Sequence, residues 1–452
     1  MPTQPRRPAG MLAFSLVWAG QIVSVLATNM TGFAITIWVY ERTHSATALG
    51  LAQVFFITPY LLVTPLVGIM VDRYNRKMMM MLSDLGAGLA TVGLLVLQSQ
   101  GRLEIWHLYA ANLMTGTFNS FQWPAYSAAI STMVPKEQLG RANGMMSLVE
   151  IGPGVIAPLL AGALLPFIHL TGILLIDVTT FVTAIAVLLA VYVPQPPVTE
   201  AGREGRGGIL KEALYGFRYI FARPSLLGLQ LVFMTGNLMA GLAYTVLAPM
   251  ILARTSNNGV TFGTVQSVGA IGGVIGGIAM GAWGGFKRRV HGVLAGWMMG
   301  SAFFALVGVG TWIPLWVGGL ALCTLCGPII DGSNQAIWQS KVAPDLQGRV
   351  FTARRLIAWI TNPISPLIAG LAGDYLLEPA MRSTNAFSSL FGSIAPIGPG
   401  AGMGLIVFFG ALGGILAGLT GYFVHHIRDV ETVLPDHDAQ PNSPLPIGKG
   451  VR

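Results

Sequence analysis

Long apolar stretches separated by short polar loops constrain this chain more than any other feature of its sequence. The 452 residues contain twelve such stretches, near 11–39, 46–71, 78–98, 105–133, 142–167, 169–193, 225–253, 260–285, 290–311, 313–340, 350–376 and 400–426. A helix needs roughly 20 apolar residues to cross a bilayer core. Only helices and closed barrels satisfy their backbone in lipid, and these stretches are continuous rather than alternating. The sequence therefore predicts an all-α integral membrane protein with twelve transmembrane helices.

The charged residues support this prediction and orient the chain. Only 10% of residues are charged, whereas a soluble domain carries about 25%. The Lys and Arg residues gather in alternate loops, and the other set of loops contains only Arg42, Arg102, Arg254 and Arg382. Basic loops stay in the cytoplasm, so both termini are expected there. The net charge of +8 is then explained by orientation, and no nucleic-acid partner is expected.

A long polar stretch at 194–224 separates the spans into six and six. We expect an N-terminal six-helix bundle at 1–193 and a C-terminal six-helix bundle at 225–427. The stretch between them begins as a Pro/Gly-rich linker and continues with apolar residues at helical spacing, which predicts an amphipathic helix on the inner membrane surface. The polar tail at 428–452 is expected to be disordered.

The two halves carry related loops. VPKEQLGRANG at 134–144 has a counterpart in VAPDLQGRVFT at 342–352, and GIMVDRYNRK at 68–77 aligns with GAWGGFKRRV at 281–290. Duplicated six-helix halves are typical of transporters that work by alternating access, with the substrate site between the halves. The sequence therefore predicts two pseudo-symmetric bundles around a central site.

The loop after the second span holds the most specific motif, Gly68-Ile-Met-Val-Asp72-Arg73-Tyr-Asn-Arg76-Lys77. It resembles the signature loop of the major facilitator superfamily. The resemblance implies that Asp72 accepts hydrogen bonds from Arg76 and from the N-terminus of a helix in the other half, where the helix dipole favours an anion. Such a contact would hold the cytoplasmic gate shut. The second copy of the loop has Gly285 in place of the acid.

Two further segments narrow the resemblance within this superfamily. Trp38-Val-Tyr-Glu41-Arg-Thr43-His-Ser45-Ala and the stretch 339–351 look like the drug:proton antiporter branch, which holds macrolide-efflux-like and siderophore-exporter-like permeases. This resemblance implies proton-coupled efflux of amphipathic small molecules by alternating access. Gly152 and Pro153 in the fifth span resemble the Gly-Pro element of antiporters and favour export over import. The alternative is a dedicated exporter of one metabolite, such as a siderophore or a peptide natural product.

Four carboxyl groups lie within predicted spans, and no Lys or Arg is expected beside them. An unpaired carboxyl in lipid is costly when charged, so it is a candidate for proton coupling or cation binding. Glu150 and Asp331 are the stronger candidates, followed by Asp177 and Asp84. Asp84 lies close to the Asp72 loop and could instead support that loop. Each of the four could also be a neutral, hydrogen-bonded structural group.

Polar and aromatic residues in central spans could line the substrate cavity. The candidates are Gln21, Asn29, Asn119, Gln122, Trp123, Asn237, Gln266, Asn334 and Gln335. Amide side chains can equally well link neighbouring helices.

No motif indicates a cofactor, a metal site or nucleotide binding, and we expect no enzymatic activity. The Cys323–Cys326 pair lies in an apolar span without further ligands and is expected to pack between helices. A membrane enzyme, a flippase-like protein and a sensor are the alternatives from other classes. The expected partners are a small-molecule substrate, protons and the lipid bilayer. We expect a monomer in the inner membrane of a bacterial cell.

Overall fold

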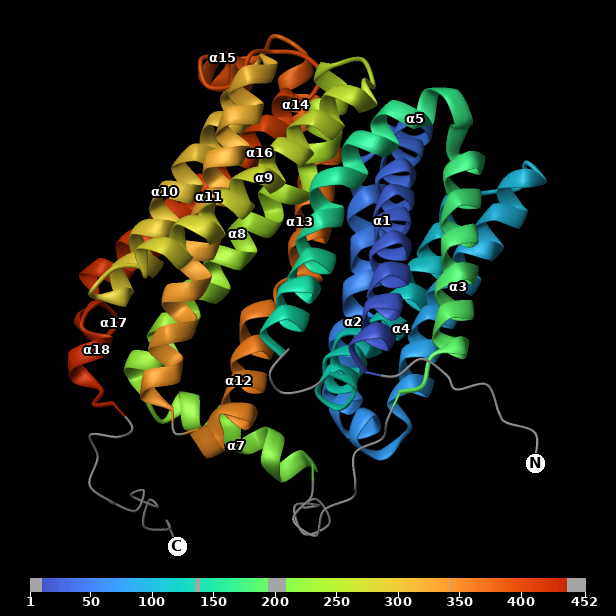
Figure 1. Cartoon of the computed structure of the whole chain (residues 1–452). Helices are drawn as coiled ribbons and strands as arrows, with labels where there is room; N and C mark the ends of the chain where they lie inside the picture. The colour runs from blue at the N-terminus through green and yellow to red at the C-terminus, as the bar shows by residue number, and fades with distance from the viewer. Residues whose placement is uncertain (1–9, 135–138, 194–208, 343, 437–452) are drawn as a thin grey trace, which may run out of the picture.

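The computed structural model describes residues 10–134, 139–193, 209–342 and 344–436. Within these ranges every regular element is a helix (Figure 1). The all-α prediction is confirmed. The linker at 194–208 and the tail at 437–452 lie outside the described residues.

The N-terminal half consists of α1 (Gly10–Thr43), α2 (Ala46–Arg73), α3 (Arg76–Ser99), α4 (Ile105–Met133) and α5 (Leu139–Ala190). α5 is two helices that meet at His169, whose φ of 54° reverses the chain (Figure 1). The reversal falls between the predicted fifth and sixth spans. The five elements therefore make six crossings.

The C-terminal half begins with the surface helix α7 (Ile209–Phe221) and continues with α8 (Pro224–Arg254), α9 (Gly259–Trp283), α10 (Arg289–Val309) and α11 (Ile313–Lys341). The next crossing is broken into α12 (Pro344–Trp359), α13 (Ile364–Ala372), the π-helical turn η2 (Gly373–Leu377) and α14 (Glu378–Arg382). It is followed by the short helix α15 (Ala386–Phe391) and by α16 (Ala401–Phe423).

Ten described segments are long and apolar enough to span a membrane. One of them is the paired helix of α5, which crosses twice. α4 supplies the remaining crossing, because it packs between α2 and α3 over its length. The protein is thus a multi-pass membrane protein with the twelve predicted crossings.

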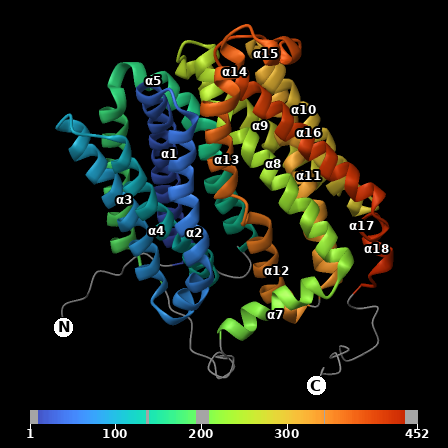
Figure 2. The same cartoon turned by 180° about the vertical axis from the view of Figure 1, so that it is seen from behind.

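The buried residues show how the two halves meet. At one end both halves contribute to a single core, which contains Ile37 and Leu49 from one half and Met250 and Phe262 from the other. At the opposite end each half has a core of its own. The halves therefore converge at one end, called here the closed end, and separate at the other, called the open end (Figures 1 and 2).

The helix α7 lies at the open end and packs on α12 (Figure 2). Ile220 of α7 is fully buried in the core of the C-terminal half. The Tyr219 hydroxyl donates a hydrogen bond of 3.1 Å to the Lys341 carbonyl oxygen. Part of the apolar face of α7 is thus covered by the protein itself.

The start of the C-terminal tail is structured, although we expected disorder from residue 428. The short helices α17 (His425–Arg428) and α18 (Val430–Val433) fold back on the open end of the C-terminal half. Val430 is fully buried, which gives this segment an apolar anchor that its overall polar composition conceals.

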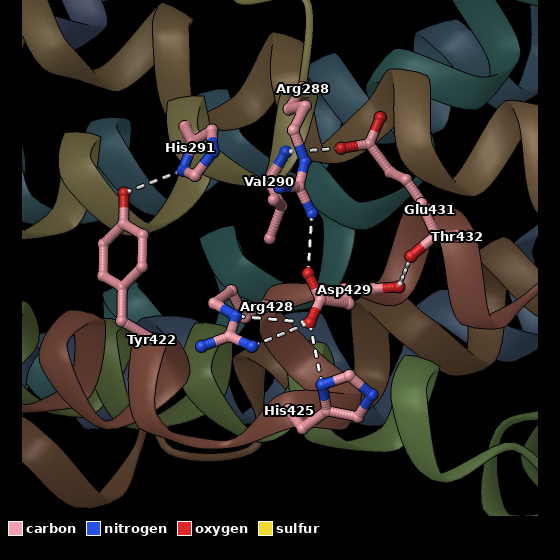
Figure 3. A network of polar contacts seen from close by, with 9 residues as sticks. All are labelled: Arg288, Val290, His291, Tyr422, His425, Arg428, Asp429, Glu431 and Thr432. Atoms are coloured by element: carbon pink, nitrogen blue, oxygen red, sulfur yellow. Dashed lines mark hydrogen bonds and ion pairs between the residues drawn. The ribbon is translucent and has the colours of Figure 1, made fainter.

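An ionic network, the C-terminal clasp, holds this segment in place (Figure 3). The Asp429 carboxylate accepts a hydrogen bond of 2.7 Å from Arg288, and His425 Nδ1 lies 2.8 Å from it. Hydrogen bonds from Arg428 and Arg288 lower the pKa of Asp429 to about 2. The Val290 amide donates to Glu431 at 3.1 Å. The clasp therefore ties the α17–α18 segment to the start of α10.

Candidate transport pathway and gates

A cavity of about 920 Å³, the central cavity, lies between the two halves. Its lining comes from α1, α2, α4 and α5 on one side and from α8, α9, α11, α12 and α13 on the other. The described lining is uncharged. Its polar members are Thr36, Gln53, Asn112, Asn237, Tyr244, Thr245, Gln266, Thr324, Asn362 and Ser365. Together with Phe56, Phe262 and Trp359 they form a surface that suits an amphipathic molecule.

Close contacts between α5 and α9 shut the cavity at the closed end. A Cβ atom added at Gly162 of α5 would lie 2.8 Å from the Gly259 carbonyl oxygen of α9, so the approach requires glycine. The rings of Phe33 and Phe262 stack beside it with centroids 5.0 Å apart. These contacts join the two halves directly at the closed end.

A second contact at the closed end is electrostatic. The Asp374 carboxylate of η2 accepts hydrogen bonds from the backbone amides of Ala46 at 2.8 Å and Thr47 at 2.7 Å, and from the Ser45 hydroxyl. These groups form the N-terminus of α2 in the other half, where unpaired amides and the helix dipole favour an anion. We call this contact the Asp374 latch. The sequence analysis gave Asp374 no role, and its predicted span 350–376 ends just after this residue.

The Gly-Pro element of the fifth span lies next to these contacts. Pro153 is buried, Gly152 is partly buried and the following residue, Gly154, lines the central cavity. The carbonyl of Pro158 packs against Gly263 of α9. The segment that follows the element therefore contributes to the wall of the cavity, and the predicted role of Gly152 and Pro153 stays a prediction.

Among the predicted carboxyl groups, Asp84 lies in a polar cluster inside the N-terminal half. Gln21 of α1 donates to it at 2.7 Å, and Gln122 of α4 donates to it at 3.3 Å. Gln122 also donates to Gln21 at 3.2 Å. Gln21 is 4% exposed, so the Asp84 cluster links α1, α3 and α4 and does not line the central cavity. None of these contacts joins Asp84 to the Asp72 loop, so the alternative that Asp84 supports this loop stays a prediction.

Asp177 is buried between helices of the same half. It is 2% exposed and accepts hydrogen bonds from Thr28 at 2.9 Å and from Thr91 at 3.4 Å. These threonines belong to α1 and α3, whereas Asp177 belongs to the second part of α5. The carboxyl group therefore connects three helices.

Asp331 faces a pocket of about 760 Å³, the open-end pocket, which shares Asn237 and Trp359 with the central cavity. The pocket is also lined by Gln230, Asn334, Gln335, Arg354 and Arg355. The sequence analysis was wrong to count both arginines with the cytoplasmic basic residues, although the predicted span 350–376 includes them, and to expect no basic residue beside the acids within the spans. α12 already begins at Pro344, so both lie about three helical turns inside it.

The remaining predicted site residues fall in several places. Gln266 lines the central cavity, whereas Asn29 donates to the Val25 carbonyl oxygen within α1. Asn119 is partly buried on α4, outside the lining of the central cavity.

The gate loop is described only in part. Lys77 Nζ donates to the carbonyl oxygens of Leu189 at 3.1 Å and Val191 at 2.7 Å, both in the same half. Arg76 begins α3. Five side chains lie outside what the structure describes: Gly68, Asp72, Arg73, Trp123 and Glu150. Their predicted roles stay predictions.

Two six-helix halves around a cavity that is closed at one end define a membrane transporter. Residues 17–366 match the family model described as Major Facilitator Superfamily. The chain therefore belongs to the major facilitator superfamily, as the gate loop predicted.

Characterised relatives cover most of the chain. Macrolide efflux protein A of Streptococcus pyogenes is 26% identical over 369 residues, which are 80% of this chain and 90% of that protein. The enterobactin exporter EntS of Escherichia coli is 26% identical over 392 residues, which are 84% of this chain and 89% of that protein.

Solved structures confirm the fold. A bacterial homologue of the human lysosomal transporter Spinster, inward-facing and unoccupied, matches with a TM-score of 0.64 and 15% identity over 91% of this chain and 95% of that chain. An inward-facing bacterial homologue of the iron transporter ferroportin matches with a TM-score of 0.62 and 14% identity over 90% of this chain and 97% of that chain.

Proposed function

We propose that this protein exports amphipathic small molecules across the bacterial inner membrane in exchange for protons, working as a monomer by alternating access. The observation that carries the proposal is the central cavity between halves that share a core at one end only. Basic residues of the described open end, such as Arg288 and Lys341, support a cytoplasmic location for this end. In this state the cavity would receive its cargo from inside the cell.

The lining and the relatives support an amphipathic cargo. Amide and hydroxyl groups alternate with aromatic rings in the central cavity, and its described lining is uncharged. A macrolide efflux protein matches 80% of the chain. The second candidate is a dedicated exporter of one metabolite, such as a siderophore or peptide natural product, which the match to an enterobactin exporter over 84% of the chain favours.

We assign proton coupling to Asp84 before the other carboxyl groups. Ionisable groups at membrane depth commonly mark proton or ligand sites. Among the described residues, the hydrogen-bond partners of Asp84 are neutral amide groups. Asp84 can therefore bind and release a proton without breaking an ion pair with any of them. Binding a proton would weaken the hydrogen bonds that link α3 to α1 and α4, and α1 also lines the central cavity. Asp177, held by threonines, is assigned a structural role, and Glu150 remains a candidate.

Efflux from cells tests the function directly. Cells that express the protein are loaded with a panel of dyes and antibiotics, and efflux is followed with and without an uncoupler. We expect uncoupler-sensitive efflux of at least one compound, and its loss in Asp84→Asn with normal amounts of protein in the membrane. Glu104→Gln, which changes an exposed acid outside the cavity, is the matched control. Efflux of a compound that is insensitive to the uncoupler would refute proton coupling, and unchanged efflux by Asp84→Asn would refute the role of Asp84.

A further inference from the structure

The charge along the pathway is confined to one place. Among the described residues that line the central cavity and the open-end pocket, the charged ones are Asp331, Arg354 and Arg355. All three lie in the open-end pocket. Two guanidinium groups outnumber one carboxylate, so the pocket has a net positive charge when all three are ionised.

The Arg354 guanidinium has no ion-pair partner within 4.0 Å among the described residues. Its Nη1 atom is buried and has no hydrogen-bond partner. Asp331 forms no ion pair within 4.0 Å with either arginine in the described ranges. The guanidinium is held by aromatic rings instead, 5.4 Å from the centroid of Trp338 and 5.3 Å from that of Phe351. A buried donor without a partner is costly unless a ligand satisfies the group.

Arg355 is oriented in a similar way at the junction of the two cavities. Its guanidinium carbon lies 4.6 Å from the ring centroid of Trp359, which lines both cavities. Stacking on an aromatic face fixes a guanidinium while its N–H groups stay available for hydrogen bonds. A molecule that moves between the pocket and the central cavity would therefore pass Arg355.

The neighbouring amides are already occupied. Gln230 donates to the Arg354 carbonyl oxygen at 2.9 Å, and Asn237 donates to the Ala358 carbonyl oxygen at 3.0 Å. These bonds anchor α12 to α8 and fix the backbone that carries the two arginines. With Gln230 and Asn237 used in this way, the two guanidinium groups are the charged donors among the described residues of the pocket.

We propose that Arg354 and Arg355 form an oxyanion-binding subsite that receives an acidic group of the cargo. The preferred cargo is then an amphipathic molecule with a carboxylate, which guanidinium groups bind through paired hydrogen bonds. Its apolar part would extend past Trp359 into the uncharged central cavity. The inference rests on the proposed function, since it assumes that the pocket belongs to the export pathway.

A matched pair of fluorescent probes tests this subsite by binding alone. Dansyl-phenylalanine and its methyl ester differ only in the carboxylate, and their binding to the full-length protein in phosphatidylcholine nanodiscs is measured by dansyl emission. We expect the acid to bind about tenfold more tightly than the ester, the size of one charge-assisted hydrogen bond. Arg354→Gln should remove this preference and leave ester binding unchanged, and Arg354→Lys should keep part of it.

The second variant and the control keep the test decisive. Arg355 is exposed, so Arg355→Gln is expected to fold and to weaken binding of the acid alone. Arg218→Gln, on the exposed face of α7, should change neither affinity. The subsite is refuted if the acid and the ester bind the wild-type protein equally well, or if neither binds. It is also refuted if Arg354→Gln and Arg355→Gln weaken the binding of both probes equally.

Two further comparisons distinguish a carboxylate of the cargo from a lipid headgroup as the bound anion, and a failure of the subsite from a failure of the proposed function. If anionic phosphatidylglycerol in the nanodiscs abolishes the acid preference, the subsite holds lipid headgroups and the proposal is wrong. Binding without a gradient does not depend on proton coupling. If the protein shows uncoupler-sensitive efflux but does not prefer the acid, the subsite alone is refuted. If it prefers the acid but shows no uncoupler-sensitive efflux, the proposed function alone is refuted.

Discussion

The Asp374 latch makes a quantitative prediction about the gate at the closed end. Asp374→Asn removes the charge that faces the N-terminus of α2 and leaves one acceptor oxygen for the three donors that the carboxylate now serves. A charge at a helix N-terminus contributes about 0.3–2 kcal/mol, and a hydrogen bond to a charged group about 1.5–3 kcal/mol. We expect a net loss of about 1–3 kcal/mol, because the amide oxygen retains part of the bonding.

This loss should shift the population towards a state in which the closed end is open. A change of about 1.4 kcal/mol alters an equilibrium constant tenfold, so we expect the open fraction to rise about 5- to 150-fold. Ile37 is 1% exposed and packs against Gly259 at the closed end. In a protein without its two native cysteines, Ile37→Cys should react with a membrane-impermeant maleimide at least about fivefold faster when Asp374→Asn is added.

The control is Glu41→Gln, which removes an exposed acid near the same end. It should leave the labelling rate unchanged. If Asp374→Asn labels no faster than this control, the carboxylate does not hold the closed end together and our account of this gate is wrong.

Three further predictions concern other contacts. Gly162→Val should prevent α5 and α9 from approaching, since a Cβ atom there already lies 2.8 Å from a carbonyl oxygen; faster outside labelling of Ile37→Cys checks this, and an unchanged rate contradicts it. Asp177→Ala should destabilise the protein by about 1–3 kcal/mol, because the Thr28 hydroxyl loses its carboxylate acceptor and Thr91 keeps only the Ala87 carbonyl oxygen; an unchanged midpoint of thermal unfolding would argue against that role. Because hydrogen bonds from Arg428 and Arg288 lower the pKa of Asp429 to about 2, the clasp should be intact above about pH 4 and lost as the pH falls through that lowered pKa. Hydrogen exchange of the backbone amides of 425–434 measures this. The prediction is wrong if their protection does not fall at low pH and is the same in the wild-type protein and in Asp429→Asn.

The fold was largely predictable because its main determinant is local. Spans follow from the length of apolar runs, and the boundary between the fifth and sixth spans is the reversal at His169. The crossing that contains α12 was the exception. Its first turns are polar, and the count of basic residues assigned Arg354 and Arg355 to a cytoplasmic segment, although they line a pocket between the helices. A polar helix that faces a cavity has no apolar signature.

The candidate site was less predictable because its contacts join distant segments. Asp84 was recognised as a buried acid, but its contacts with Gln21 and Gln122 depend on how three helices pack. Asp374 reaches the start of α2 across more than 300 residues of sequence.

The most direct test of proton-driven export uses purified protein in liposomes with an imposed pH gradient. The account predicts that at least one compound from the dye and antibiotic panel accumulates against its own gradient, in the direction opposite to proton flow. Nigericin, which collapses the pH gradient, should abolish this accumulation, and Asp84→Asn liposomes should not show it. Movement that is independent of the pH gradient, or that follows the protons in the same direction, would contradict the account.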